Sequence, residues 1–223
     1  MPSVNDTRTR TRAVIQWSIL PLVFITIGLG WKWPLVGFVV PVVMMMGVVG
    51  GVFSGRYVCG NLCPRGAFFD RLMPYVSRQA QIPRFMRNMA LRWALFGALM
   101  GFMVWRISLD GANIYHWGSV FWLMCTITTG VGVVLAVLFH QRGWCSICPI
   151  GTAANALGGG KGQLEINSAA CRECRVCEKA CPIAIPIVVH KPSGVLADRD
   201  CVRCDECIAR CPARALAWPR SPL

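Results

Sequence analysis

The sequence predicts a helical membrane domain of four spanning helices, followed by a small, cysteine-rich soluble α+β domain. Three observations support this prediction: long apolar runs, crowded cysteines, and arginines gathered between alternate runs. Of the 223 residues, 55% are hydrophobic and only 15% are charged, which is too apolar for an ordinary soluble domain. Cysteine occurs thirteen times and mostly after residue 170, a density that indicates disulfides or metal.

Four apolar runs are long enough to cross a membrane, which takes roughly 20 mostly apolar residues in a helix. The first run follows several arginines, as a signal peptide would. It is long for one, however, and no small-residue cleavage site follows it, so we expect a retained helix. The third has a short apolar core, and it spans if Arg92 and Arg106 extend to the two interfaces. The predicted spans cover about residues 13–31, 33–53, 91–109 and 117–139.

The arginines indicate the orientation, because loops that stay in the cytoplasm carry an excess of Lys and Arg. The turn after the first span holds only Lys32, and the 108–116 loop holds neither residue type. We therefore expect both chain ends and the long 54–90 loop to be cytoplasmic. The arginines on that side are Arg8, Arg10, Arg12, Arg56, Arg65, Arg71, Arg78, Arg84 and Arg87.

A cysteine motif follows the second span and returns after the fourth. "RYVCGNLCPRGA" begins at Arg56 and "RGWCSICPIGT" at Arg142, so two spans and a Cys-Pro motif form a unit used twice. Repeats in membrane proteins often place a site at their interface. We expect one metal site at the cytoplasmic face, with an iron–sulfur cluster, zinc or copper left open, and unligated cysteines as the alternative. Its candidate ligands are Cys59, Cys63, Cys145 and Cys148, with the flanking arginines favouring thiolate.

The end of the chain carries a stronger signal, two copies of C-x2-C-x2-C-x3-C-P at residues 171–182 and 201–212. In two-cluster ferredoxins of bacterial type, three cysteines of one copy and the fourth of the other hold each [4Fe–4S] cluster. A zinc site would not require a third cysteine at the same spacing. The sequence therefore predicts two [4Fe–4S] clusters. The first is assigned to Cys171, Cys174, Cys177 and Cys211, the second to Cys201, Cys204, Cys207 and Cys181.

The chain divides accordingly into a transmembrane domain at 1–157, a glycine-rich linker at 158–163 and a two-cluster ferredoxin domain at 164–218. We expect a βαββαβ-like pseudo-twofold arrangement in the last part. Cys125, the remaining cysteine, lies within a span and is expected to be a buried, inert thiol.

These motifs resemble, over nearly the whole chain, the NapH/MauN family of membrane ferredoxin-type proteins. "GRYVCGNLCPRGAF" is similar to a membrane 4Fe–4S motif shared with a nitrous-oxide reductase maturation regulator and a membrane cupric reductase. The resemblance implies a multi-pass protein of the bacterial cytoplasmic (inner) membrane that takes electrons from quinol, like a quinol dehydrogenase subunit. The second motif has two spacer residues where relatives often have three.

Three functions remain open at this point. The first is electron transfer between the quinone pool and a redox partner protein, which would be a ferredoxin-like protein, a cytochrome or a reductase. The second is copper reduction or metalloenzyme assembly, since soft thiolates suit Cu(I). The third is a membrane anchor for a soluble redox partner. The formal charge of +13 is explained by membrane topology, and no nucleic-acid-binding motif accompanies it.

Overall fold

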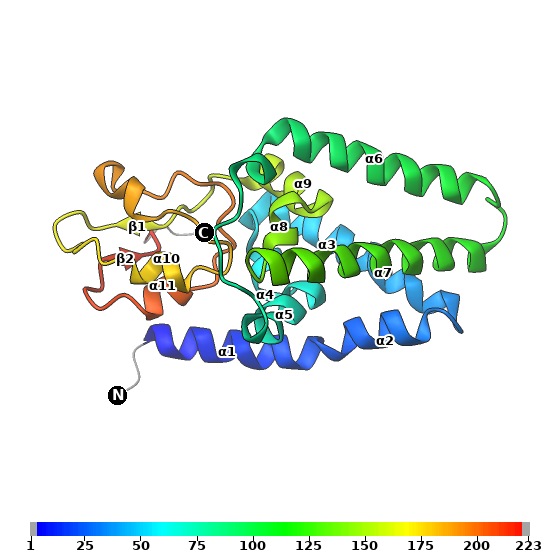
Figure 1. Ribbon diagram of the computed structural model, residues 1–223, viewed down its shortest axis with the longest axis horizontal. Coiled ribbons are helices and arrows are strands. Elements are labelled where there is room, and N and C mark those ends of the chain that lie inside the picture. The colour runs from blue at the N-terminus through cyan, green and yellow to red at the C-terminus, as the bar shows by residue number, and fades with distance from the viewer. Residues whose placement is uncertain (1–3, 220–223) are drawn as a thin grey trace.

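The computed structural model describes residues 4–219. It is elongated, with long helices at one end and the cysteine-rich tail at the other (Figure 1). Within the described residues, four helical segments are long and apolar enough to cross a membrane, in agreement with the four predicted runs. They are Thr7–Leu29, Pro34–Ser54, Met89–Ser108 and Ile114–Leu138.

Proline shapes the first two spanning segments. The first is divided into α1 (Val4–Ile19) and α2 (Pro21–Leu29), because Pro21 has no N–H to continue the helical hydrogen bonding. In the second, a 3₁₀ turn at Pro34–Phe38 leads into α3 (Val39–Ser54). Both segments therefore carry an irregular turn instead of forming one uninterrupted α-helix.

The third and fourth segments, α6 (Met89–Ser108) and α7 (Ile114–Leu138), begin at asparagine caps. The side chain of Asn88 accepts from the N–H of Ala90 at 2.9 Å, and Asn113 accepts from that of Tyr115 at 3.0 Å. Arg92, near the start of α6, is only 1% exposed and pairs with a carboxylate of the tail domain.

Two pairs of short helices lie where the spanning segments meet the tail domain (Figure 1). Each pair belongs to one copy of the Cys-Pro motif, and in both copies the second cysteine of the motif separates the two helices. Cys63 and Cys148 are extended, with ψ of 119° and 132°, as residues before proline prefer, and the proline then opens the next helix. The helices are α4 (Tyr57–Asn61), α5 (Pro64–Arg71), α8 (Gly143–Ile147) and α9 (Pro149–Gly158).

The tail domain contains two strands in the described residues, β1 (Glu165–Ile166) and β2 (Leu216–Ala217), paired antiparallel with Ile166 opposite Leu216. Two short helices, α10 (Val176–Ala180) and α11 (Glu206–Ala209), lie within the two cysteine motifs. The expected α+β fold is thus present only in part, as a minimal sheet beside two helical turns. Its buried apolar core includes Leu164, Ile183, Ile185 and Leu196.

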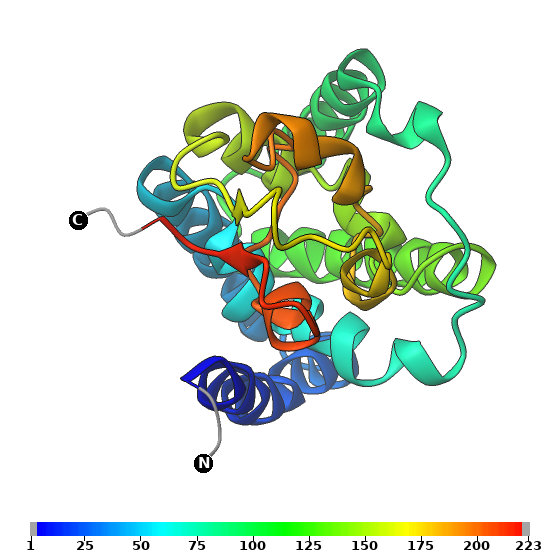
Figure 2. The same cartoon turned by 90° about the vertical axis from the view of Figure 1, so that its left-hand side faces the viewer.

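The tail domain packs against the end of the helical bundle (Figure 2). Residues 158–163, expected to form a flexible linker, lie against α3, and Lys161 donates to the carbonyl of Val52 at 2.6 Å. The segment between α5 and α6, by contrast, arches around one side of the molecule (Figure 2). The cysteine motifs of the bundle and those of the tail are therefore brought next to each other.

Candidate metal centres

The first tail cavity is lined by the cysteines of one motif and by a single cysteine from the other. Cys171, Cys174 and Cys177 come from the first motif, and Cys211 comes from the second. The structure thus brings together the four side chains that the spacing assigns to the first cluster. Cys174 is exposed, so this cavity lies close to the surface of the tail domain.

The second tail cavity has the reciprocal composition. Cys201, Cys204 and Cys207 of the second motif line it, together with Cys181 of the first. Both Cys204 and Cys207 are buried. Each motif contributes its fourth cysteine to the cavity of the other motif, because α10 packs beside α11. Cys181 directly follows α10, and Cys211 comes shortly after α11.

The two motifs also share an unusual backbone. In each, the residues on either side of the second cysteine have positive φ: Glu173 and Arg175 in the first, Arg203 and Asp205 in the second. The left-handed region costs a non-glycine residue roughly 1–3 kcal/mol, and such residues gather at ligand-binding sites. Strain repeated at matched positions indicates loops shaped to surround a bound group.

A second matched feature lies after the fourth cysteine of each motif. The N–H of Ile185 donates to Sγ of Cys181 at 3.5 Å, and the N–H of Ala215 donates to Sγ of Cys211 at 3.4 Å. Hydrogen bonds to sulfur are a means by which proteins tune iron–sulfur potentials. These bonds are therefore in place at both predicted cluster sites.

Burial is the main influence on the tail thiols. It raises the pKa of Cys177 to about 11 and the pKa values of Cys201 and Cys204 to about 12. Metal and cluster ligands must be thiolates, so binding here releases protons. Neutral thiols in an apolar pocket with strained loops are what we expect of a binding site without its cluster, since cluster binding would convert the thiols to thiolates.

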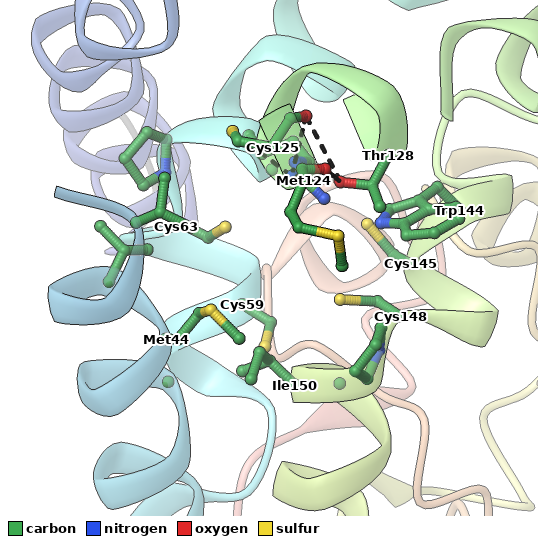
Figure 3. Close-up of a pocket in the computed structure, with 18 of the residues that line it drawn as sticks. Met44, Cys59, Cys63, Met124, Cys125, Thr128, Trp144, Cys145, Cys148 and Ile150 are labelled. Atoms are coloured by element: carbon green, nitrogen blue, oxygen red, sulfur yellow. Dashed lines mark hydrogen bonds between the residues drawn. The ribbon is translucent and has the colours of Figure 1, made fainter. Parts of the chain in front are cut away.

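The four cysteines of the membrane repeat line one cavity of about 160 Å³. Cys59 and Cys63 come from the first motif, and Cys145 and Cys148 from the second. Figure 3 shows the side chains of Cys63 and Cys148 entering the same space from opposite sides. The four cysteines therefore line one cavity, at the junction of the bundle and the tail domain.

The repeat arginines hold the two motifs together reciprocally. Arg142 of the second motif donates to the carbonyl of Cys59 at 2.9 Å, and Arg56 of the first donates to the carbonyl of Cys145. Each also lies against the other motif's glycine: a Cβ on Gly66 would meet Arg142 at 3.1 Å, and one on Gly151 would meet Arg56 at 2.6 Å. The shared Arg and Gly of the motif thus form the interface of the pseudo-symmetric site.

The expected effect of these arginines on the thiols is only partly correct. They do lower the pKa of the nearby cysteines, but burial acts more strongly in the opposite direction. The net result raises the pKa of Cys59 to about 11 and that of Cys145 to about 12. The main role of Arg56 and Arg142 is therefore to hold the backbone of the two loops.

Each arginine is neutralised by a buried carboxylate. Asp70 on α5 binds Arg142 through both oxygens, each at 2.6 Å. Asp200, in the tail domain next to Cys201, accepts from Arg56 at 2.9 Å and binds Arg92 through both oxygens at 2.9 and 2.5 Å. Asp200 is therefore an ionic connection between the membrane site and the second tail motif.

Residue patterns along the chain did not identify these contacts. Their partners are far apart in sequence, so local spacing carries no signal for them. The one available signal was the presence of polar residues near the start of the first span, where they are costly unless paired. The contacts that were not predicted involve Arg12, Gln16, Asp70, Arg92, Asn155 and Asp200.

Cys125 differs from expectation as well. It is not fully buried, it lines the same cavity as the four motif cysteines, and its sulfur lies 3.5 Å from a guanidinium nitrogen of Arg65. The same arginine donates to the hydroxyl of Thr128 at 2.8 Å. Arg65 and Thr128 thus supply polar groups to a cavity that is otherwise mostly apolar.

The number of cysteines at each cavity is enough to hold a cluster. Among residues 4–219, no three His, Cys, Asp or Glu side chains are close enough to hold a single metal ion. In a [4Fe–4S] cluster each cysteine binds a different iron at a corner of a cube, so its ligands surround a larger object. Three cavities, each lined by four or more cysteines, match that requirement.

Two family models match the chain. One, described as a 4Fe–4S binding domain, matches residues 36–79 and 120–167, which contain the two membrane Cys-Pro motifs. The other, described as a 4Fe–4S dicluster domain, matches residues 170–216. An uncharacterized protein of Methanocaldococcus jannaschii is 22% identical over 178 residues, which are 78% of this chain and 68% of the relative.

No solved structure matches the chain. The more specific resemblance to NapH/MauN proteins stays a prediction. The two 4Fe–4S family models, together with four membrane-length helices, support an iron–sulfur, ferredoxin-like protein associated with a membrane.

Proposed function

We propose that the protein transfers electrons between quinol in the membrane and a soluble redox partner. The observation that carries this proposal is the thiol-lined cavity. Its walls include Leu22, Val39, Leu99 and Phe121, one residue from each of the four spanning segments, and the cysteines of the membrane repeat. An apolar molecule in the membrane and a thiolate-bound cluster would therefore share one cavity.

The residues of this cavity have distinct roles in the proposal. A [4Fe–4S] cluster, when bound by Cys59, Cys63, Cys145 and Cys148, supplies one-electron redox chemistry. Arg56 and Arg142 fix the two loops through carbonyl hydrogen bonds. The apolar wall excludes water, and Arg65 and Thr128 offer hydrogen bonds to the oxygens of a quinol head group. Quinol would give up two electrons, one at a time, to the redox partner and would release two protons to water.

The order of the three sites follows from the packing. The turn that carries Cys59 lies directly on the second tail motif: a Cβ on Gly60 would lie 2.0 Å from the carbonyl oxygen of Val202, and Asn61 donates to the carbonyl of Arg203 at 3.3 Å. We place the second tail motif next to the membrane site. The first motif, with exposed Cys174, would face the redox partner.

The function is tested in anaerobic proteoliposomes that contain a quinol, with cluster reduction followed by visible absorption and electron paramagnetic resonance. Serine at all four membrane-motif positions should abolish quinol-linked reduction while the tail clusters remain reducible by dithionite. Cys125→Ser is the matched control, because Cys125 lines the same cavity outside the motifs. An unchanged rate in the fourfold variant would refute the proposal.

The order is tested separately with two single variants. Cys204→Ser damages the site next to the membrane motif and should block quinol-linked reduction of the first tail cluster. Cys174→Ser damages the outer site and should leave reduction of the second tail cluster intact. The opposite pattern would place the first motif nearer to the donor.

Copper handling is the second candidate, and one observation favours it. The methionines Met44, Met100, Met103 and Met124 line the cavity that holds the cysteines, and thioethers and thiolates both bind Cu(I). Replacement of all four by leucine keeps the apolar volume and removes the sulfur. Cu(I) binding in competition with bicinchoninate, lost in this variant, would support the copper function, and unchanged quinol-linked reduction would separate it from electron transfer.

A further inference from the structure

A large cavity lies away from the thiol-lined site, between the arching segment and the tail domain. Its volume is about 1100 Å³, slightly above the roughly 300–1,000 Å³ typical of small-molecule pockets. One wall comes from residues 71–87, the opposite wall from residues 175–186, and the edge from α1 and α11. Figure 2 shows the arching segment standing apart from the tail domain on this side.

The walls carry an excess of positive charge. Three acidic residues line the cavity, and each is already engaged: Asp70 by Arg12 and Arg142, Glu206 by Arg12, and Glu178 by the N–H of Val188. Within residues 4–219, no ion pair neutralises Arg84, Arg175 or Lys179 in these walls. The seven cations are Arg12, Arg71, Arg84, Arg87, Arg175, Lys179 and Arg210.

Two buried nitrogens of the same walls have no hydrogen-bond partner in the described residues. They are Nη2 of Arg71 and Nδ1 of His140, a residue that is only 4% exposed and that also contacts the backbone of Pro182. A buried polar group without a partner costs roughly 1–3 kcal/mol, so an acceptor oxygen placed at Nη2 of Arg71, which can only donate, would be favoured, and Nδ1 of His140 would donate to it in its Nδ1–H tautomer. This observation is independent of the charge count, and it points to the same kind of ligand.

The cavity also has an apolar side. Ile82, Ile185, Pro74, Pro182 and Pro186 line it and offer a surface for a ring or an acyl chain. A bare inorganic ion would leave most of this volume unfilled. The combination of cations, unpartnered nitrogens and apolar wall fits a molecule with an anionic group and an apolar body.

We propose that this cavity binds a phosphate-bearing organic molecule of cofactor size. Arg71, Arg84 and His140 would contact the phosphate, since guanidinium groups bind phosphate oxygens in pairs. Ile82 and Pro182 would contact the body of the ligand. The phosphate comes either from a soluble nucleotide-type cofactor or from an anionic lipid whose head group enters beside the bundle, and the experiment distinguishes these sources.

The test uses the full chain in nanodiscs of neutral phosphatidylcholine, titrated with FMN and with ADP. In a second arm, nanodiscs contain phosphatidylglycerol, and retained lipid is counted by native mass spectrometry. The variant is Arg84→Gln with Arg175→Gln, two exposed residues without ion pairs, so the fold should persist. The matched control is Arg78→Gln, an exposed arginine of the same segment that does not line the cavity.

The variant should weaken binding about tenfold or more, the effect of losing charge-assisted hydrogen bonds, and the control should bind like the wild type. FMN or ADP binding with this pattern identifies a soluble cofactor, and retained phosphatidylglycerol with this pattern identifies a lipid. Absence of binding to the wild type in both arms, or equal binding by variant and wild type, overturns the proposal. The iron content and the visible absorption of the clusters do not depend on ligand binding in this cavity. A failure of this proposal can therefore be distinguished from a failure of the proposed electron-transfer function.

Discussion

At the scale of residues, the centre of the molecule is held by buried charges. Arg56, Arg92 and Arg142 are at most 2% exposed, and Asp70 and Asp200 compensate them. Burial alone would raise the pKa of Asp200, but its arginine partners, led by Arg56, lower it to about 2. Such pairs contribute modestly when intact, but loss of one member leaves an uncompensated charge in the interior.

Asp200→Asn should therefore be strongly destabilising. It would leave Arg56 and Arg92 facing a neutral amide, and we expect a loss of about 3–5 kcal/mol in the free energy of unfolding. Asp198→Asn is the matched control, because its pair with Arg87 is partly exposed and should contribute at most about 1 kcal/mol. Thermal unfolding in detergent measures both variants, and equal stabilities would contradict the proposed role of Asp200.

Asp70 makes a prediction about pH. Burial raises its pKa, but Arg142 and Arg12 outweigh that effect, so the folded-state pKa lies below the ordinary value of 3.8. A lowered folded-state pKa contributes stability that is fully present above the unfolded pKa and is lost as pH falls through the folded one. The stability difference between wild type and Asp70→Asn should thus be constant from about pH 7 to 5. A difference that closes within that window would show that Asp70 titrates there.

At the scale of elements, the contacts of the tail motifs could be predicted from the sequence more completely than those of the membrane motifs. Cluster ligation restricts the spacing of Cys171 to Cys177, so the cavity-lining residues of the tail followed from the pattern. The repeat likewise predicted that Cys63 and Cys148 converge. The reciprocal bonds of Arg56 and Arg142 were not predictable, because each depends on a carbonyl from the other repeat.

Packing of α4 on the second tail motif is the element-level contact on which the proposed electron path depends. Gly60→Ala would place a Cβ 2.0 Å from the carbonyl oxygen of Val202, a separation that real structures do not show, so the two elements must move apart. We expect slower quinol-linked reduction of the tail clusters with their iron content retained.

Gly97→Ala on α6 is the control for that variant, because a Cβ there meets nothing within 4 Å. Stopped-flow absorption under anaerobic conditions gives the rate of reduction. A Gly60→Ala rate equal to that of Gly97→Ala would mean that electrons do not cross at this contact.

At the scale of the whole molecule, both the start of α1 and the tail domain lie at the same end of the bundle, opposite the turn between α6 and α7 (Figure 1). An even number of spans places the beginning and the end of the membrane domain on the same side of the membrane. Arginine counting predicts that the shared end is cytoplasmic. Alkaline phosphatase fused after Leu223 should be inactive, and the same enzyme inserted near Asn113 should be active. The reverse pattern would invert the proposed orientation.

The fixed position of the tail domain against the bundle could not be predicted from the sequence. Glycine-rich residues 158–163 suggested a flexible tether, but the ion pairs of Asp200 and the contact of Lys161 with α3 hold the domain against the bundle. Composition describes the freedom of an isolated segment and not the contacts made by the domains it joins. The consequence is that three cysteine-lined cavities occupy one continuous structure.

We propose that the membrane repeat holds a third cluster. The most direct measurement is the iron and acid-labile sulfide content of anaerobically purified protein, compared with the variant in which Cys59, Cys63, Cys145 and Cys148 are all serine. We expect about twelve iron atoms per chain in the wild type and about eight in the variant, each cluster contributing four. About eight in both proteins would contradict it, and the four membrane cysteines would then hold no cluster.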